Sequence, residues 1–250
     1  MIHLIHERLQ VIALWSPPGC RSTALEQMMT GRGDLTVLHE PFNKVATRGS
    51  YGFQGRSYGN GTALLDAVLS SAHRPGARPV LFKDSTALRH PDLLMDTRFT
   101  ARIQHTFLVR DPAEVIASHH AGNPETTSEE IGFGNCWEIF ELARLASGAH
   151  PVVVDAADLL TRPRDVAAAY AAHTGLPPAP APAGWTMDEE GTSDTADGRT
   201  GNPADTVHGN PHLAELYAEQ LPYYEWLSAH RLEPAVPVTG RPGTPLTAKT

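Results

Sequence analysis

Uninterrupted runs of aliphatic and β-branched residues recur along the first two thirds of the chain and predict buried strands. The runs are Leu9–Trp15, Leu35–His39, Pro79–Phe82, His105–Val109 and Pro151–Val154. Strands that are covered on both faces have no polar side to expose, so their sequences lack the alternation of a half-exposed strand. The pattern therefore predicts a parallel sheet with helices on both of its faces.

Stretches with apolar residues at helical spacing separate these runs. They cover residues 20–29, 63–72, 113–119 and 134–146, and a later one covers residues 213–227. Strands that alternate with helices form βαβ units, in which consecutive parallel strands are joined by a helix. The predicted fold class is therefore α/β, a three-layer sandwich with a central parallel sheet flanked by helices.

The chain of 250 residues, 41% of them hydrophobic, is long enough to bury one sizeable core. We expect residues 1–232 to form a single α/β domain. Residues 176–210 are rich in Pro, Ala, Gly and Asp without periodicity, which predicts a long loop or lid. The Pro-rich residues 233–250 predict a flexible tail.

Composition excludes several classes of function. A formal net charge of −8 argues against binding to nucleic acid or to a membrane surface, because both require a broad basic face. No apolar run is long enough for a membrane helix, and MIHLIHERLQ resembles no targeting peptide, so we expect a cytoplasmic protein. Cys20 and Cys136 form no disulfide framework, and without an HExxH pattern no metal site is expected.

Ligands of parallel α/β sheets bind beyond the carboxyl ends of the strands. This rule selects residues 16–23, 40–43, 83–85 and 110–118, each of which directly follows a predicted strand. The candidate site should therefore be assembled from these four segments.

The segment WSPPGCRSTAL, residues 15–25, joins the first strand to a helix through a Pro/Gly turn. Such a turn directs backbone N–H groups and the helix N-terminus at one place, which suits a phosphate or a sulfate. It is not a Walker A loop, because GxxxxGK[ST] is absent and Arg21 stands where a lysine would be needed. An ordinary strand-to-helix turn is the alternative interpretation of this segment.

The segment HTFLVRDPAEVIASHH, residues 105–120, ends a strand at Arg110 and opens a helix at Asp111-Pro112. An arginine can fork onto a phosphate, and the hydroxyl of Ser118, about two helical turns further on, can donate to the same group. A helix start with a surface arginine is the alternative.

Together the two segments resemble those of the sulfotransferases that depend on 3′-phosphoadenosine-5′-phosphosulfate (PAPS). SPPGCRST, residues 16–23, resembles the loop for the 5′-phosphosulfate, and RDPAEVIAS, residues 110–118, resembles the 3′-phosphate motif. The resemblance covers roughly residues 11–170 and continues more weakly through residues 217–230. It implies a P-loop NTPase-like sandwich and an enzyme that uses PAPS as cosubstrate without a metal.

Carried over residue by residue, the resemblance assigns most of the nucleotide site. The 5′-phosphosulfate would be held by Arg21, Ser22 and Thr23 with the backbone of Pro18, Gly19 and Cys20, and the 3′-phosphate by Arg110 and Ser118. The late loop is acidic where the family commonly has a basic, Gly-containing segment. GRTGN, residues 198–202, is its only faint equivalent, and it makes Arg199 a further cofactor contact.

Transfer of a sulfuryl group needs cations for the leaving phosphate and a base for the acceptor's proton. We assign the first role to Arg21 and the base to Glu40, which follows the second strand in LHEPF. His39 competes with Glu40, and strand alternation would point the two side chains to opposite sides. His208 in the late loop is a reserve. Glu40 could instead cap a turn or pair with an arginine.

Lys83 is one of only three lysines and follows a third strand. It could bind the sulfuryl oxygens or orient the acceptor, or form an ion pair with Asp84 or Asp111. The predicted function is transfer of the PAPS sulfuryl group to a hydroxyl of a small molecule, such as a bacterial secondary metabolite. The alternatives are a P-loop kinase-like phosphotransferase and a noncatalytic module that binds PAPS or its desulfated product, PAP.

Overall fold

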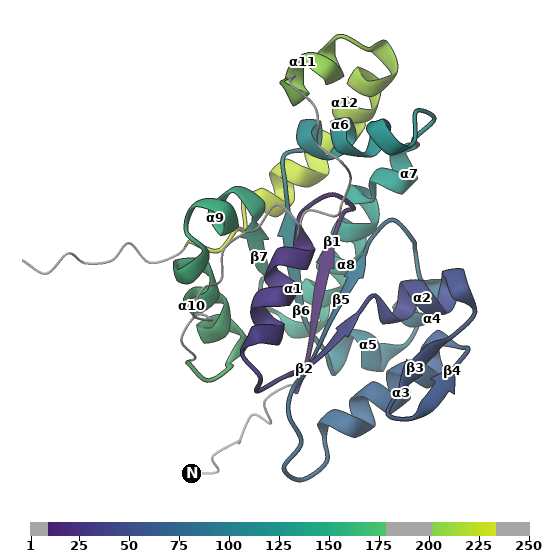
Figure 1. The fold of residues 1–250 in the computed structure, drawn as a ribbon, viewed down its shortest axis with the longest axis vertical. Helices are drawn as coiled ribbons and strands as arrows, with labels where there is room; N and C mark the ends of the chain where they lie inside the picture. The colour runs from purple at the N-terminus through teal and green to yellow at the C-terminus, as the bar shows by residue number, and fades with distance from the viewer. Residues whose placement is uncertain (1–9, 179–201, 234–250) are drawn as a thin grey trace, which may run out of the picture.

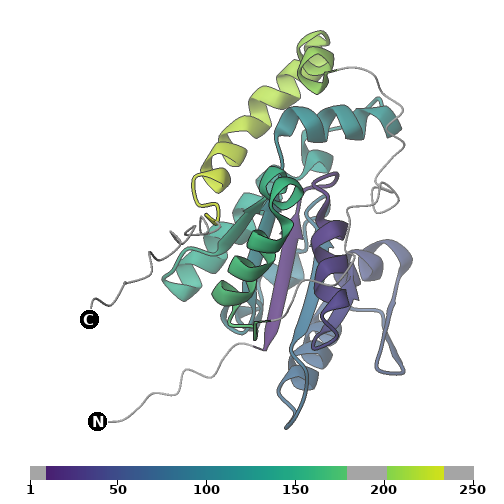
Figure 2. The same ribbon diagram turned by 60° about the vertical axis from the view of Figure 1, so that its left-hand side comes forward.

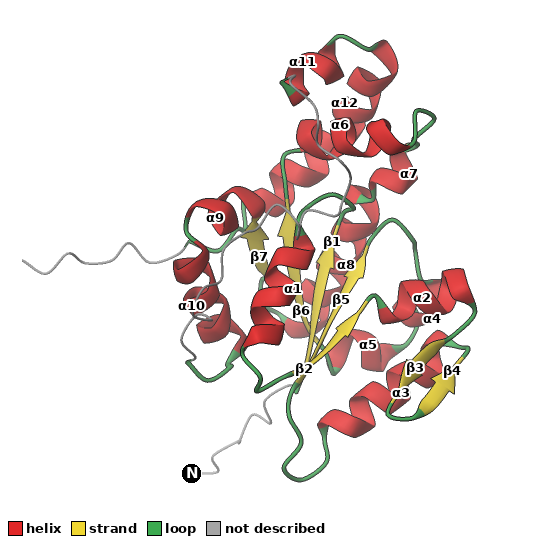
Figure 3. Cartoon of the chain, viewed as in Figure 1, coloured by secondary structure: helices red, strands yellow, loops and turns green. Residues whose placement is uncertain are grey.

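A sheet of five parallel strands lies at the centre of the molecule. The computed structural model of the chain describes residues 10–178 and 202–233. The strand order is β2-β5-β1-β6-β7, where the strands are β1 (Val11–Ser16), β2 (Thr36–His39), β5 (Val80–Ser85), β6 (Gln104–Val109) and β7 (Val152–Asp155). Figure 3 shows that all five run in the same direction. The predicted parallel sheet is confirmed, and each strand overlaps one of the predicted apolar runs.

The remaining elements surround this sheet. Strands β3 (Tyr51–Phe53) and β4 (Arg56–Tyr58) form a separate antiparallel hairpin. The helices are α1 (Ser22–Gly31), α2 (Pro41–Arg48), α3 (Gly61–Ala72), α4 (Pro91–Leu94), α5 (Thr97–Ala101), α6 (Pro112–Gly122), α7 (Ser128–Ile131), α8 (Phe133–Ser147), α9 (Ala156–Thr161), α10 (Pro163–Thr174), α11 (Pro203–His208) and α12 (Pro211–Ser228).

Strand register divides the core between the two faces of the sheet. Thr106 pairs with Leu14 across the sheet, and its hydroxyl forms a hydrogen bond of 2.8 Å with the hydroxyl of Tyr170 on α10. Helix α10 therefore covers the face of the sheet on which Leu14 and Thr106 lie. Phe107 pairs with Trp15 and packs against Phe140 of α8, with ring centroids 5.4 Å apart, on the opposite face. Figure 1 shows α1 in front of the sheet and α8 behind it. The predicted three-layer α/β sandwich with a central parallel sheet is confirmed.

The helices α6, α11 and α12 stand above the carboxyl ends of the strands (Figures 1 and 2). Helix α12 packs on α6 and α8, and Figure 2 shows it running back down the molecule. After α12 the backbone N–H of Leu232 donates to the carbonyl of Val153 in β7, at 2.7 Å. The part of the chain after the late loop therefore belongs to the same packed unit as the sheet.

Part of the predicted long loop is helical. Residues 203–208 form α11, which begins at Pro203 and is capped by the side chain of Asn202. Val207 is fully buried against the neighbouring helices, and this tertiary contact fixes a segment whose sequence has no periodicity. The prediction of a long loop or lid over residues 176–210 did not include this helix, and the predicted tail, residues 233–250, lies almost wholly outside the described residues. None of the described helices is long and apolar enough to cross a membrane.

Candidate active site at the carboxyl ends of the strands

The turn that follows β1 has two residues in the left-handed backbone region. Gly19 has φ 74° and Arg21 has φ 61°. Arg21 is also the N-cap residue of α1, and its side chain makes no capping hydrogen bond. The first N–H groups of a helix have no intrahelical acceptor, and the helix dipole adds positive potential there. The turn therefore presents main-chain donors at the end of β1, as an anion site requires.

Helix α6 brings the second predicted segment to this turn. The Nη1 of Arg110 donates to the carbonyl of Gly19 at 3.0 Å. A Cβ on Gly19 would lie 3.8 Å from the Oγ of Ser118. Arg110 also forms an ion pair with Glu114, through an Nε–Oε2 contact of 2.6 Å. Residues that are about ninety positions apart in the sequence thus meet around one glycine.

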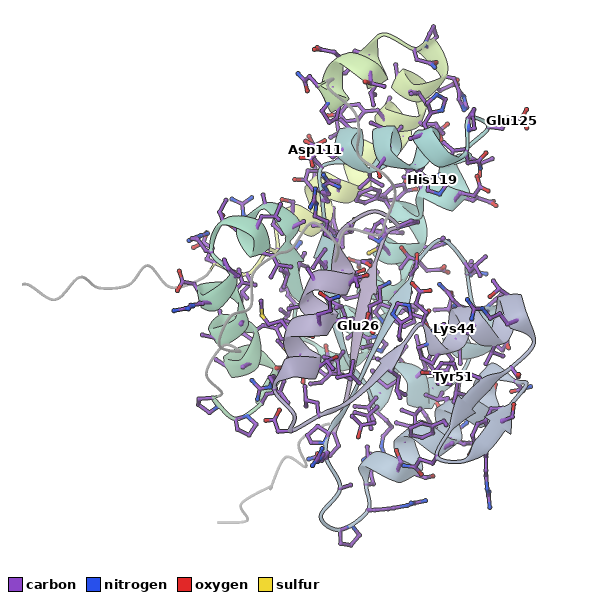
Figure 4. The ribbon with its side chains drawn as sticks, viewed as in Figure 1. Glu26, Lys44, Tyr51, Asp111, His119 and Glu125 are labelled. Atoms are coloured by element: carbon purple, nitrogen blue, oxygen red, sulfur yellow. The ribbon has the colours of Figure 1, made fainter. Side chains whose placement is uncertain are left out.

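Local signals in the sequence set the position of α6. Pro112 occupies its first turn, and the carboxylate of Asp111 accepts from the N–H of Ala113 at 2.7 Å. Asp111 and His119 mark the two ends of α6 in Figure 4, across the top of the strands. Because the helix starts directly after β6, Arg110 is fixed at the sheet edge and Ser118 two turns along.

Lys83, which lies within β5 and not after it as predicted, forms an ion pair with Glu40, the residue directly after β2. The Nζ of Lys83 lies 2.6 Å from the Oε1 of Glu40, and the side chains are 5% and 29% exposed. The partner of Lys83 is thus neither Asp84 nor Asp111. Burial raises the pKa of Glu40, but the opposite effects of Lys83, His39 and Lys44 together outweigh it, so that pKa is lowered overall. Glu40 is therefore an ionised carboxylate able to accept a proton near neutral pH.

His39 and Glu40 lie close together, contrary to the expectation from strand alternation. Glu40 has left the extended conformation, with φ 49° and ψ 51°, and is the N-cap residue of α2. Its Oε2 lies 4.0 Å from the Nε2 of His39. The Nδ1 of His39 contacts the carboxylate of Glu26 on α1, at 2.9 and 3.1 Å. The expectation failed because alternation holds only while the backbone stays extended.

Asp84 is a buried residue whose role the sequence did not reveal. Its carboxylate accepts from the N–H groups of Phe42 and Asn43 at 2.8 and 3.3 Å, and so fixes the start of α2. Complete burial raises its pKa to about 8, although those backbone donors act in the opposite direction. By anchoring the first turn of α2, Asp84 holds Glu40 next to Lys83.

The donors at this edge fit a phosphate or a sulfate group. Ser16, the last residue of β1, has a buried Oγ with no hydrogen-bond partner among the described residues. Ser16 pairs with Ser85 across the sheet, two residues beyond Lys83, so Ser16 and Lys83 face the same side. Oxyanions are bound by hydrogen-bond donors of the kinds found at this edge, namely hydroxyl groups, an ammonium, a guanidinium and main-chain N–H groups.

His208, the reserve candidate for the base, and His105 lie away from the Lys83–Glu40 pair. His208 ends α11 and packs its ring against Tyr217 of α12, above the sheet, whereas Glu40 starts α2 at the side (Figure 1). His105 is a core residue: its Nδ1 accepts from the Nε1 of Trp15 at 3.0 Å, and its Nε2 lies 2.8 Å from the carbonyl of Phe99. Arg199 lies outside the described residues. Within residues 10–178 and 202–233, no group of three or more His, Cys, Asp or Glu side chains could hold a metal.

Comparisons with known proteins bear on this arrangement. A family model described as a sulfotransferase domain matches residues 9–208. A solved structure, the sulfotransferase domain from the curacin biosynthetic pathway, is similar over 85% of this chain and 97% of that chain, with 15% identity and a TM-score of 0.39. A comparison with curated proteins finds no match. The matched residues include the turn after β1, the Lys83–Glu40 pair and helix α6.

Proposed function

The chain belongs to the sulfotransferase domain family, and from this premise we propose that it transfers the sulfuryl group of PAPS to a hydroxyl of a small-molecule acceptor. The observation that carries the proposal is the meeting of the turn after β1 with helix α6 at Gly19. One phosphate site at the start of α1 and a second one beside Arg110 match a nucleotide with phosphate groups at two positions of its ribose.

The nucleotide contacts that we propose are those that the resemblance of the two segments implies. Arg21, Ser22 and Thr23, with the main chain of residues 18–20, hold the 5′-phosphosulfate, and Arg110 and Ser118 hold the 3′-phosphate. Arg110 is already held by Gly19 and Glu114, so its guanidinium is oriented before nucleotide binds. PAPS supplies the activated sulfuryl group and leaves as PAP.

Glu40 takes the acceptor's proton in the proposed reaction. The acceptor oxygen forms a bond to sulfur, the bond from sulfur to the bridging phosphate oxygen breaks, and the hydroxyl proton moves to Glu40. Lys83 holds one carboxylate oxygen of Glu40 at 2.6 Å, which leaves the other oxygen for the acceptor. Arg21, at the start of α1, stabilises charge that develops on the leaving phosphate.

The acceptor of this proposal is a small alcohol or phenol, of the kind that bacterial secondary metabolism provides, and the reaction takes place in the cytoplasm. Glu40 supports an acceptor of this class, because an oxygen nucleophile has a proton that a carboxylate can remove. The arginine-rich, lysine-poor composition is the support for a bacterial setting.

Replacement of the base tests the proposal. The wild-type protein should transfer labelled sulfate from PAPS to members of a panel of alcohols and phenols. Glu40→Gln should lower kcat by about 10²–10⁴-fold, the usual contribution of a positioned base, and leave PAP binding within about twofold. Glu138→Gln is the matched control, because Glu138 also forms an ion pair but lies on α8. Normal transfer by Glu40→Gln would refute the base assignment.

A further inference from the structure

Glu26 is a carboxylate buried in the apolar face of α1. It is 7% exposed and lies among the buried side chains of Leu25, Met28 and Met29. A buried carboxylate is costly unless hydrogen bonds compensate for its lost hydration. Both oxygens of Glu26 contact the Nδ1 of His39, at 3.1 and 2.9 Å. Glu26 therefore has a specific partner at the end of β2, next to the proposed base.

A carboxylate can only accept hydrogen bonds, so the Nδ1 of His39 carries a hydrogen and donates a hydrogen bond to Glu26. The other ring nitrogen, Nε2, then faces the Oε2 of Glu40 at 4.0 Å. When His39 is protonated, the charges alternate along the row Glu26, His39, Glu40 and Lys83, which spans α1, β2 and β5.

The backbone of His39 also has hydrogen-bond partners. The Nζ of Lys44 donates to the carbonyl of His39 at 2.9 Å, and Tyr51 also hydrogen-bonds the backbone of His39. Figure 4 shows Glu26 on α1, and Lys44 and Tyr51 together on the side of α2 and the hairpin. At the 4.0 Å separation no hydrogen bond joins His39 to Glu40, so the ring acts on Glu40 through its charge.

We infer that Glu26 is a positioning residue for the proposed transfer: it holds the His39 imidazole beside Glu40, so that the proposed base stays ionised into mildly acidic solution. The expected effect on sulfuryl transfer rests on the proposed function, whereas the expected effect on the ionisation of Glu40 does not. The cations around Glu40, namely His39, Lys44 and Lys83, all lower its pKa, while burial raises it. Asp84 is the nearby carboxyl group on β5, and the negative charge of Glu40 is one of the causes that raise the pKa of Asp84, after burial.

Carboxyl-group NMR titration of Glu40 tests the inference without any acceptor or PAPS. Glu26→Gln should raise the titration midpoint of Glu40 by roughly 0.5–1 pH unit, because His39 is no longer held in place. His39→Gln should raise it in the same direction, and adding Glu26→Gln to His39→Gln should change nothing further. Asp34→Asn, which removes an ion pair near the other end of α1, is the control and should leave the midpoint unchanged.

In the transfer assay, the acidic limb of the pH profile of kcat/KM should shift together with the titration midpoint of Glu40. If Glu26→Gln does not fold, Glu26→Asp retains the charge, shortens its reach and should move the midpoint in the same direction. An unchanged titration midpoint of Glu40 in the Glu26→Gln variant would overturn the inference. So would a Glu26→Gln substitution that shifts this midpoint equally in the wild-type and His39→Gln proteins. Failure of the wild-type protein to sulfate any acceptor would count against the proposed function and leave the titration result as it stands.

Discussion

Single residues at the strand ends adopt conformations that their local sequence does not favour. Among the described residues other than glycine, Arg21, Glu40 and Gln54 have positive φ. A left-handed conformation costs an L-residue roughly 1–2 kcal/mol, and such costs are common where a site over-determines the backbone. The sequence predicted that Arg21 and Glu40 lie at strand ends, but not how they point. Nor did it predict the Lys83–Glu40 pair, because that contact depends on the register of β2 against β5.

Asp84 makes the stability of the protein depend on pH. Its pKa in the folded state is about 8, above the 3.8 of a free aspartate, so the unfolded state releases this proton first. Its contribution to the free energy of unfolding is therefore complete below pH about 4 and is lost as the pH rises through about 8. The loss is at most about 1.4 kcal/mol per pH unit.

Denaturant unfolding between pH 6.5 and 8 isolates this effect. Burial lowers the pKa of His105 to about 4 from 6.5, so the stability that His105 contributes is complete above pH 6.5 and does not change in this window. The wild-type protein should lose stability across the window, and Asp84→Asn should show a flatter dependence. Equal slopes for the two proteins would contradict the assignment.

At the scale of elements, turns and helix ends were harder to predict than strands. All five strands of the sheet overlap apolar runs, because strands buried on both faces leave a strong local signal. The hairpin β3–β4 and helix α11 were missed, since their short segments are stabilised by packing on other elements. Gly132, between α7 and α8, also depends on a distant contact: the hydroxyl of Thr86, just after β5, donates to its carbonyl at 2.8 Å.

Replacement of Gly132 should damage this junction. Its φ is +81°, and an added Cβ would lie 2.8 Å from the carbonyl oxygen of Thr86. Gly132→Ala should lower the free energy of unfolding by roughly 2–4 kcal/mol, from backbone strain plus this clash. Gly33→Ala is the matched control, because Gly33 has φ +71° but no atom within 4 Å of the added Cβ. In denaturant unfolding, Gly33→Ala should lower the free energy of unfolding by only about 1 kcal/mol. Equal losses in the Gly132→Ala and Gly33→Ala variants would rule out the clash.

At the scale of the whole molecule, the order of the strands assembles the candidate site. Strand β1 lies between β5 and β6, so it adjoins both the strand that carries Lys83 and the strand that leads to Arg110. The rule for parallel sheets predicted that these segments share one edge. It could not predict which segments adjoin, because strand order is decided by packing of the complete chain. The contact of Arg110 with Gly19 and the burial of Glu26 and Asp84 therefore had to come from the structure.

Calorimetric titration with PAP, with ADP and ATP as comparison ligands, is the decisive experiment for the proposed PAPS site. PAP should bind tightly and ADP and ATP much more weakly, and Arg110→Ala should lose about 1.5–3 kcal/mol of PAP binding, the value of a charged hydrogen bond. Arg162→Ala is the control, since it removes a comparable arginine ion pair of the same helical spacing on the surface, and it should bind PAP normally. Absence of PAP binding, or a preference for ATP, would refute the PAPS site and favour a kinase-like phosphotransferase.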